Sequence, residues 1–252
     1  MIEPGKDIIA SSYELVCSKW RERKIVSRDD LAAALVEYRV YFAYNSNRIE
    51  NPDITYHDTR EVFENGNAVS YSGDVRALFE IQNQKECHEF MLDAWSERRA
   101  LDVDFLLETH EVLTKGTYDE HRWRQGERPG AFKRHDYVVG AKETGAPAED
   151  TEREARSLLE QLHQATESNI LTVGAFFHGV FESIHPFADG NGRVGRTLLN
   201  YLFLLFNHPP LIVYDEDKLA YYGALEAWDS EANLDPLKTF LMAETVRTWQ
   251  RS

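Results

Sequence analysis

The chain has few cysteines and no long hydrophobic run. Two cysteines among 252 residues, Cys17 and Cys87, supply neither a disulfide framework nor a set of zinc ligands, which favours a reducing, cytoplasmic setting. The apolar run 198–206 is broken by Asn200 and is far shorter than the ~20 residues needed to cross a bilayer. The N-terminus also lacks a basic leader followed by an apolar stretch. We therefore expect a cytoplasmic protein that does not enter a membrane.

Basic residues are also scarce. The chain has 28 lysines and arginines against 43 aspartates and glutamates, a net charge of −15 at pH 7. Such a field repels phosphate over long distances, so we expect no general binding to nucleic acid or to anionic lipid. Any phosphate ligand would need a small local cluster of cations and backbone amides.

Apolar residues make up 42% of the chain, and their spacing is mostly helical. We expect an all-α fold, a mostly helical bundle, in one domain over 1–252, with N-terminal helices in 1–60 and a core over about 74–249. Ser27 and Asp30 resemble a capping box that opens one long helix, which Asn51-Pro52 ends. Further helices are expected over 74–99, 104–113, 149–167, 171–184, 193–206, 216–229 and 235–249. The region 126–147, rich in Gly, Pro and charge around Tyr137-Val138-Val139, predicts a short β-hairpin or ordered loop.

The segment from His185 to Arg196 carries the most chemistry. A loop of small residues joins two apolar helices, and free amides at the start of the second helix form an anion site. Arg193 and Arg196 lie on its first turn, where they oppose the helix dipole unless a polyanion is bound. Asp189 beside phosphates suits Mg²⁺, and His185 can accept a proton near neutral pH. These residues indicate phosphoryl or nucleotidyl chemistry.

Other interpretations of this segment are weaker. Gly190-x-Gly192-x-x-Gly195 matches a dinucleotide-binding fingerprint, but that motif must follow a strand, and here a helix precedes it. A calcium loop would lack ligands at its first and last positions. A metal hydrolase using His178, His185 and Asp189 is conceivable, and a plain helix–turn–helix corner would explain the glycines but not the charges.

The stretch His185-Pro-Phe-Ala-Asp-Gly-Asn-Gly-Arg193, with Arg196 following, resembles the motif of the Fic (filamentation-induced-by-cAMP) family at every position. The wider resemblance runs from about 30 to 245. It includes Ser46-Asn-Arg-Ile-Glu-Asn51, Gly130-Ala-Phe-Lys133 and Tyr221-Tyr222. The resemblance implies the Fic fold and a protein adenylyltransferase, which moves AMP from ATP to a Tyr, Thr or Ser hydroxyl of a target protein or of itself.

Carried over residue by residue, the resemblance gives each position a role. His185 would take the proton of the attacking hydroxyl, and Asp189 would hold Mg²⁺ against the α- and β-phosphates. Gly190, Asn191 and Gly192 would form an anion hole, and Arg193 and Arg196 would contact the outer phosphates. Tyr221 and Tyr222 would lie near the adenosine. Lys133, Val138 and Val139 would belong to a flap that docks the target.

Ser46 to Asn51 also matches the family's inhibitory pattern. The resemblance implies that Glu50, in the last turn of its helix, pairs with Arg196 and takes the place of the γ-phosphate. Two alternatives stay open: a hydrolase that removes AMP with Glu50 positioning water, and transfer of another nucleotide such as UMP. A toxin controlled by an antitoxin, or a plain interaction module, is disfavoured by the intact loop. A homodimer would be a reasonable way to regulate the inhibitory helix.

Overall fold

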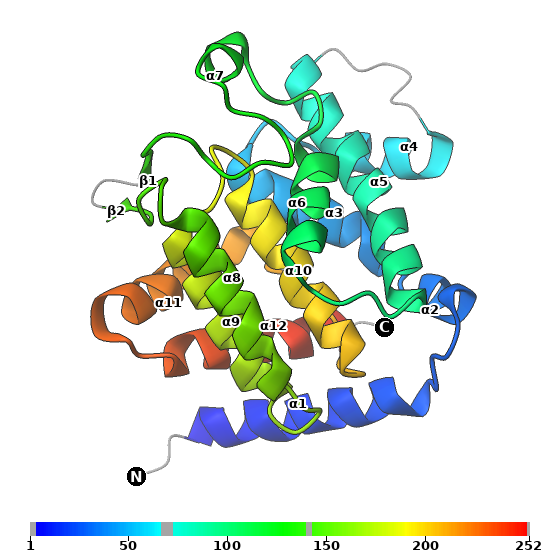
Figure 1. Ribbon diagram of the computed structural model, residues 1–252. Helices are drawn as coiled ribbons and strands as arrows, with labels where there is room; N and C mark the ends of the chain where they lie inside the picture. Colours follow the sequence, from blue (N-terminus) through cyan, green and yellow to red (C-terminus); the bar gives the residue numbers. More distant parts are fainter. Residues whose placement is uncertain (1–3, 67–72, 140–142, 251–252) are drawn as a thin grey trace.

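The computed structural model describes residues 4–66, 73–139 and 143–250, and its helices surround one central helix, α10 (Figure 1). The described helices are α1 Pro4–Glu22, α2 Arg28–Ala34, α3 Tyr38–Glu50, α4 Tyr56–Asn65, α5 Val75–Ser96, α6 Val103–Thr114, α7 Glu120–Arg124, α8 Thr151–Gln161, α9 Ile170–Ile184, α10 Asn191–Leu205, α11 Lys218–Glu231 and α12 Asp235–Trp249. Short 3₁₀ turns follow α8 (Leu162–Gln164) and precede α11 (Asp215–Asp217). The expected all-α fold is thus confirmed.

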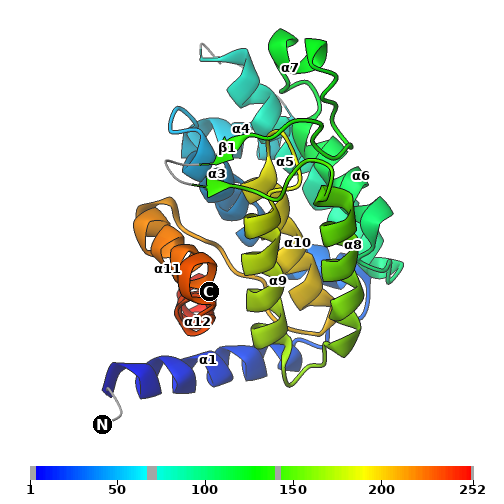
Figure 2. The same cartoon turned by 60° about the vertical axis from the view of Figure 1, so that its left-hand side comes forward.

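Helix α10 is buried along nearly its whole length because other helices pack around it. Helix α9 lies against it, and α3, α5 and α6 also contact it (Figures 1 and 2). Leu198 and Leu199 are fully buried. The approach to α9 is close at Gly174, where a side chain would collide with the Phe203 ring. Helix α10 is therefore the buried centre of the helical bundle.

The single long helix expected from Ser27 to Glu50 is wrong: the segment forms two helices, α2 and α3, separated at 35–37. The capping box is present, with Ser27 Oγ accepting from Asp30 N at 3.2 Å and Ser27 N donating to the Asp30 carboxylate at 3.0 Å. The two helices have different partners, since Leu31 of α2 packs beside α5, while the Tyr38 hydroxyl at the start of α3 donates to Leu211 O at 3.1 Å. A hydrophobic stripe alone does not reveal such a bend.

The sequence prediction expected N-terminal helices within 1–60 but gave no bounds for α1 or α4, and it did not include α7. Helix α1 lies across the base of the molecule against α12 (Figure 2), and Trp20 and Trp249 meet there with ring centroids 4.9 Å apart. Its buried residues, Tyr13, Val16, Cys17 and Trp20, do have helical spacing. Both cysteines of the chain are free and buried.

The region 126–147 is mostly irregular. Two short strands, β1 Val138–Val139 and β2 Glu143–Thr144, pair antiparallel, with Val138 opposite Thr144. The turn of the expected hairpin (140–142) and the side chains of Val138 and Val139 lie outside the described residues. A docking flap here thus stays a prediction. Within the described ranges, no helix has both the length and the apolar character that a membrane span requires.

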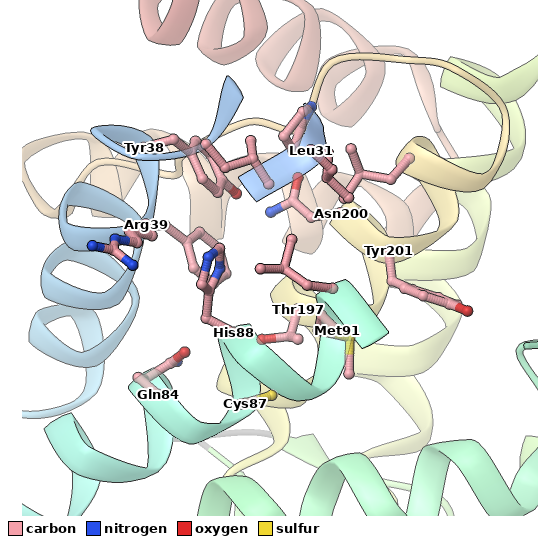
Figure 3. Close-up of a pocket in the computed structure, with 15 residues that line it drawn as sticks. Leu31, Tyr38, Arg39, Gln84, Cys87, His88, Met91, Thr197, Asn200 and Tyr201 are labelled. Atoms are coloured by element: carbon pink, nitrogen blue, oxygen red, sulfur yellow. The ribbon is translucent and has the colours of Figure 1, made fainter. Parts of the chain in front are cut away.

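A small cavity of about 40 Å³ lies among α2, α3, α5 and α10, on mostly apolar walls (Figure 3). Three buried polar atoms at this cavity, Arg39 Nε, Gln84 Nε2 and Thr197 Oγ1, have no hydrogen-bond partner among the described residues. The space is sufficient for a water molecule. It is too small for a nucleotide, so the candidate site lies elsewhere.

Candidate active site

The bend between α9 and α10 is a tight, internally bonded loop. Helix α9 ends at Ile184, His185 adopts a left-handed conformation (φ 50°), and Gly190 does the same (φ 85°) immediately before α10. The Asn191 side chain closes the loop by accepting from Phe187 N at 2.9 Å and donating to Phe187 O at 2.8 Å. The predicted start of α10 at Arg193 is thus two residues late. The amides of its first turn face a loop of fixed shape.

His110 of α6 supports the loop from below. Its ring stacks on the fully buried Phe187 ring, with centroids 3.7 Å apart and planes within 3°. Gly130 N donates to Nδ1 at 3.0 Å, which leaves Nε2 to donate to Asp189 O at 3.1 Å. Burial lowers the pKa of His110 to about 3, so the ring is neutral. Phe187 thus anchors the loop in the core.

His185 is mostly buried and uncharged at neutral pH. Burial, assisted by the Lys133 ammonium, lowers its pKa to about 4. Lys133 is 3% exposed, and its Nζ has no hydrogen-bond partner among the described residues. Its backbone N donates to Pro186 O at 3.0 Å, so the segment that carries it crosses the bend. Gly145 lies between Lys133 and His185, where a side chain would strike both. His185 is thus in the protonation state of a base.

Asp189 is 18% exposed and surrounded by donors. Arg76 Nη2 donates to Oδ2 at 2.6 Å, and Gly190 N donates to Oδ1 at 2.8 Å. Burial favours the neutral acid, but the guanidinium groups of Arg193 and then Arg76 outweigh it and hold the pKa of Asp189 below its usual value. The group is therefore a carboxylate at neutral pH.

Arg193 and Arg196 are both 2% exposed although they carry full charges. Arg193 Nη1 lies 3.3 Å from Glu80 Oε1 and Nη2 lies 3.6 Å from Asp189 Oδ1. Its Nε and Nη1 nevertheless lack a hydrogen-bond acceptor among the described residues. A buried cation with unused donors is costly unless an anion binds it. Arg193 thus has donors available for a phosphate.

Arg196 donates three hydrogen bonds to the last two turns of α3. Its Nε donates to Ser46 Oγ at 3.1 Å, and its Nη2 donates to Ser46 O at 2.8 Å and to Glu50 Oε1 at 2.9 Å. Burial alone would lower the pKa of Arg196, but the Glu50 carboxylate raises it above the ordinary value. Gly192 leaves room for this pair, since a side chain there would collide with Glu50. The predicted contact between Glu50 and Arg196 is present.

The two tyrosines predicted at the adenosine differ in their surroundings. Tyr221 is 1% exposed and its hydroxyl lies 2.6 Å from His178 Nε2, so it is a core residue. Tyr222 is 41% exposed on the same helix, within 5.5 Å of Lys218 Nζ. Tyr222 is thus the more accessible of the two.

The competing interpretations fail on geometry. His178 is fully buried against Tyr221, away from solvent, and burial lowers its pKa to about 3. Among the described residues no three His, Cys, Asp or Glu side chains cluster as a metal site. The glycine-rich loop follows a helix, which excludes the dinucleotide-binding interpretation.

The sequence is similar to those of known proteins over the part that contains this site. The sequence model of the Fic/DOC family matches residues 100–203. A probable protein adenylyltransferase, aq_aa38 of Aquifex aeolicus, is 35% identical over 86 residues, 34% of this chain and 27% of the relative. The protein adenylyltransferase Fic of Drosophila grimshawi is 27% identical over 248 residues, 90% of this chain and 48% of the relative. Residues 100–203, which include the segment from His185 to Arg196, thus resemble the Fic family. The chain spans about half the length of the fly relative.

Solved structures show the same Fic fold. A Fic domain containing signaling protein from Bacteroides thetaiotaomicron has a TM-score of 0.77 at 23% identity, covering 94% of this chain and 93% of that one. Fic-1 from C. elegans also has a TM-score of 0.77, at 20% identity, covering 97% of this chain and 70% of that one.

The structure adds four residues to the site that the motif does not contain: Arg76, Glu80, His110 and Glu182. They come from α5, α6 and α9, and three of them are far from the loop in sequence. Glu182 is the exception, since it lies three residues before His185 on a buried helix. The signal for Glu182 in the sequence was an acidic residue among the apolar residues Phe177, Phe181 and Ile184 of the same helix.

Glu182 predicts a pH-dependent stability. Burial raises its pKa to about 8, and its Oε1 has no hydrogen-bond partner among the described residues. The folded protein therefore holds a proton that the unfolded chain releases near pH 4.5, so stability falls as pH rises from about 5 to 8. Replacing Glu182 with Gln should remove a slope on the order of 1 kcal/mol per pH unit, measured by urea unfolding at pH 5 and pH 8.

The control for this measurement is Glu226→Gln, which alters an exposed carboxylate on α11. Burial also raises the pKa of Glu244 to about 8, so Glu244 contributes the same loss of stability with rising pH to wild type and to both variants. Only the difference in slope from wild type therefore reports on Glu182. Equal slopes for wild type and Glu182→Gln would contradict the assignment.

Proposed function

We propose that this protein is an adenylyltransferase that transfers AMP from ATP to a Tyr, Thr or Ser hydroxyl of a target protein or of itself. The observation that carries the proposal is the first turn of α10, where two buried arginines and free amides lie beside an uncharged His185. The names of the relatives support it. The site offers a binding place for a triphosphate and a base beside it.

The reaction follows from the residues in place. His185 accepts the proton of the attacking hydroxyl. The hydroxyl oxygen forms a bond to the α-phosphorus, the bond from that phosphorus to the bridging oxygen breaks, and pyrophosphate leaves. The amides of Asn191 and Gly192, with Arg193, would stabilise the charge on the phosphates, while the Gly190 amide keeps its bond to Asp189 Oδ1. The low pKa of His185 keeps it unprotonated and ready before each transfer.

Magnesium fits this site through Asp189. An ionised carboxylate beside a triphosphate is the donor set that Mg²⁺ prefers, with water and phosphate oxygens as its other ligands. The ion would neutralise charge on the phosphates and orient them. His110, by donating to Asp189 O, fixes the loop that presents this carboxylate.

The Glu50–Arg196 pair supports a second part of the proposal, self-inhibition by α3. Arg196 donates from Nε and Nη2 to Ser46 and Glu50, so these donors are not available to a γ-phosphate. ATP that binds without this contact would lose the in-line geometry for attack. We also assign target docking to the segment of Lys133 and β1, where an extended peptide can add to a strand edge.

Two labelled forms of ATP test the reaction class. Glu50→Gly protein incubated with Mg²⁺ and ATP should become labelled from the α-³²P form and not from the γ-³²P form. Labelled UTP, run beside it, checks the choice of nucleotide. Label from γ-³²P alone would show a kinase and overturn the proposal.

Removal of AMP from a modified protein is the second candidate function. It is favoured by the Glu50 carboxylate, which lies close enough to His185 to act on its pKa and so could orient water. Release of AMP from a modified protein by wild type, with Mg²⁺ and without ATP, distinguishes it from transfer.

A further inference from the structure

Both oxygens of the Asp189 carboxylate are occupied in this structure. Arg76 Nη2 holds Oδ2 at 2.6 Å, and the Gly190 amide holds Oδ1 at 2.8 Å. The amide belongs to the loop itself and keeps a fixed place. Arg76 is different, because it comes from the first turn of α5 and its side chain is 38% exposed. A metal ion that binds the Asp189 carboxylate through Oδ2 would have to displace the Arg76 guanidinium from that oxygen.

Arg76 is fixed at its other end by a buried carboxylate. Its Nε donates to Glu80 Oε1 at 3.1 Å, one turn further along α5. Glu80 is 3% exposed, and a carboxylate this buried needs partners. Arg193 Nη1 lies 3.3 Å from the same oxygen, so Glu80 keeps a cation beside it when Arg76 leaves. The half-exposed Arg76 can therefore swing into solvent without leaving Glu80 unpaired.

The same carboxylate is tied to the inhibitory helix. Asn51, the residue after Glu50, donates from Nδ2 to Glu80 Oε2 at 3.0 Å, and Asn47 Nδ2 donates to Glu80 O at 3.3 Å. The end of α3 is thus bonded to the residue that orients Arg76. One helix therefore contacts the site at two places, Arg196 through Glu50 and Asp189 through Glu80 and Arg76.

We propose that Arg76 is an internal counter-ion that occupies Asp189 until a metal–nucleotide complex displaces it, which makes it a second restraint beside Glu50. The proposal rests on the function proposed above. It assigns Arg76 a positioning role through Asp189, with Glu80 as its support. Removing the guanidinium should then raise the affinity for the metal–nucleotide complex and leave the affinity for metal-free nucleotide unchanged.

Calorimetry with a non-hydrolysable ATP analogue, AMPPNP, tests this without turnover. The parent is Glu50→Gly, and each protein is titrated with AMPPNP plus Mn²⁺ and with AMPPNP plus EDTA. The readout is the ratio of the two dissociation constants. Adding Arg76→Gln should increase the gain from metal about fivefold, the size expected for a partly buried ion pair. Arg76→Lys, which keeps a cation, should stay near the parent.

Two controls isolate the effect. Arg60→Gln loses the same charge from an exposed pair with Glu64 on α4, and should leave the ratio unchanged. In an Asp189→Asn background, Arg76→Gln should add nothing, because the effect passes through that carboxylate. Thermal unfolding checks that each variant folds.

An unchanged or smaller gain from metal in Arg76→Gln, with the parent binding normally, would overturn the second restraint. Failure of the parent itself to bind AMPPNP with or without Mn²⁺ would instead overturn the proposed function, and this inference with it. The two failures differ in whether the parent binds nucleotide.

Discussion

Replacing Glu50 with glycine is expected to raise the rate of AMP transfer by about two to three powers of ten over wild type. The change removes the carboxylate that accepts from Arg196 Nη2 at 2.9 Å, and so frees this buried guanidinium for the γ-phosphate. We attribute this gain in rate to correct alignment of the α-phosphate for attack. Each power of ten in rate corresponds to about 1.4 kcal/mol of activation free energy. Initial rates of label incorporation from α-³²P ATP measure it.

Two variants separate charge from helix structure. Glu50→Gln keeps the side-chain size without the charge and should be activated to a lesser degree, because the glutamine amide oxygen can still accept the hydrogen bond that Arg196 Nη2 donates to Glu50. Glu231→Gly places glycine at the last residue of another helix, α11, at an exposed site, and should transfer at the wild-type rate. Equal rates for wild type and Glu50→Gly would contradict inhibition by α3.

Replacing His185 with alanine in the Glu50→Gly protein should lower transfer by about two to four powers of ten, the usual contribution of a general base. Nucleotide binding should change little, because the phosphate contacts come from Arg193, Arg196 and the α10 amides. Calorimetry with AMPPNP checks the binding, and label incorporation checks the rate. Undiminished transfer would reject His185 as the base.

The pH profile gives an independent check on His185. Burial and Lys133 lower its pKa to about 4, and Glu50 acts in the opposite direction. Glu50→Gly removes that opposing charge, so its transfer rate should stay level down to about pH 5 and fall only below. A decline centred near pH 6.5, the ordinary value for histidine, would show that His185 is not buried in the working enzyme.

The chemistry of the α9–α10 loop could be predicted because it is local. Asp189, Arg193 and Arg196 lie within eight residues of one another, and helical spacing alone places the two arginines on one turn. The Glu50–Arg196 contact joins residues 146 apart. It was predicted only through the family pattern of SNRIEN, since nothing local pairs those two side chains.

The residues that escaped prediction act across long distances. Arg76 lies 113 residues before Asp189, and His110 lies 79 residues before it. Neither carries a local pattern that separates it from an ordinary helix residue. The break between α2 and α3 escaped for a related reason, because no proline or glycine marks residues 35–37.

Intact mass of the Glu50→Gly protein after incubation with MgATP is the most direct check on the idea that α10 orients a triphosphate for attack at its α-phosphorus. The account predicts a mass gain equal to one or more AMP groups, absent from the Glu50→Gly/His185→Ala protein and much slower in wild type. A protein of unchanged mass that also modifies no added target, or one that gains only the mass of phosphate, would contradict it.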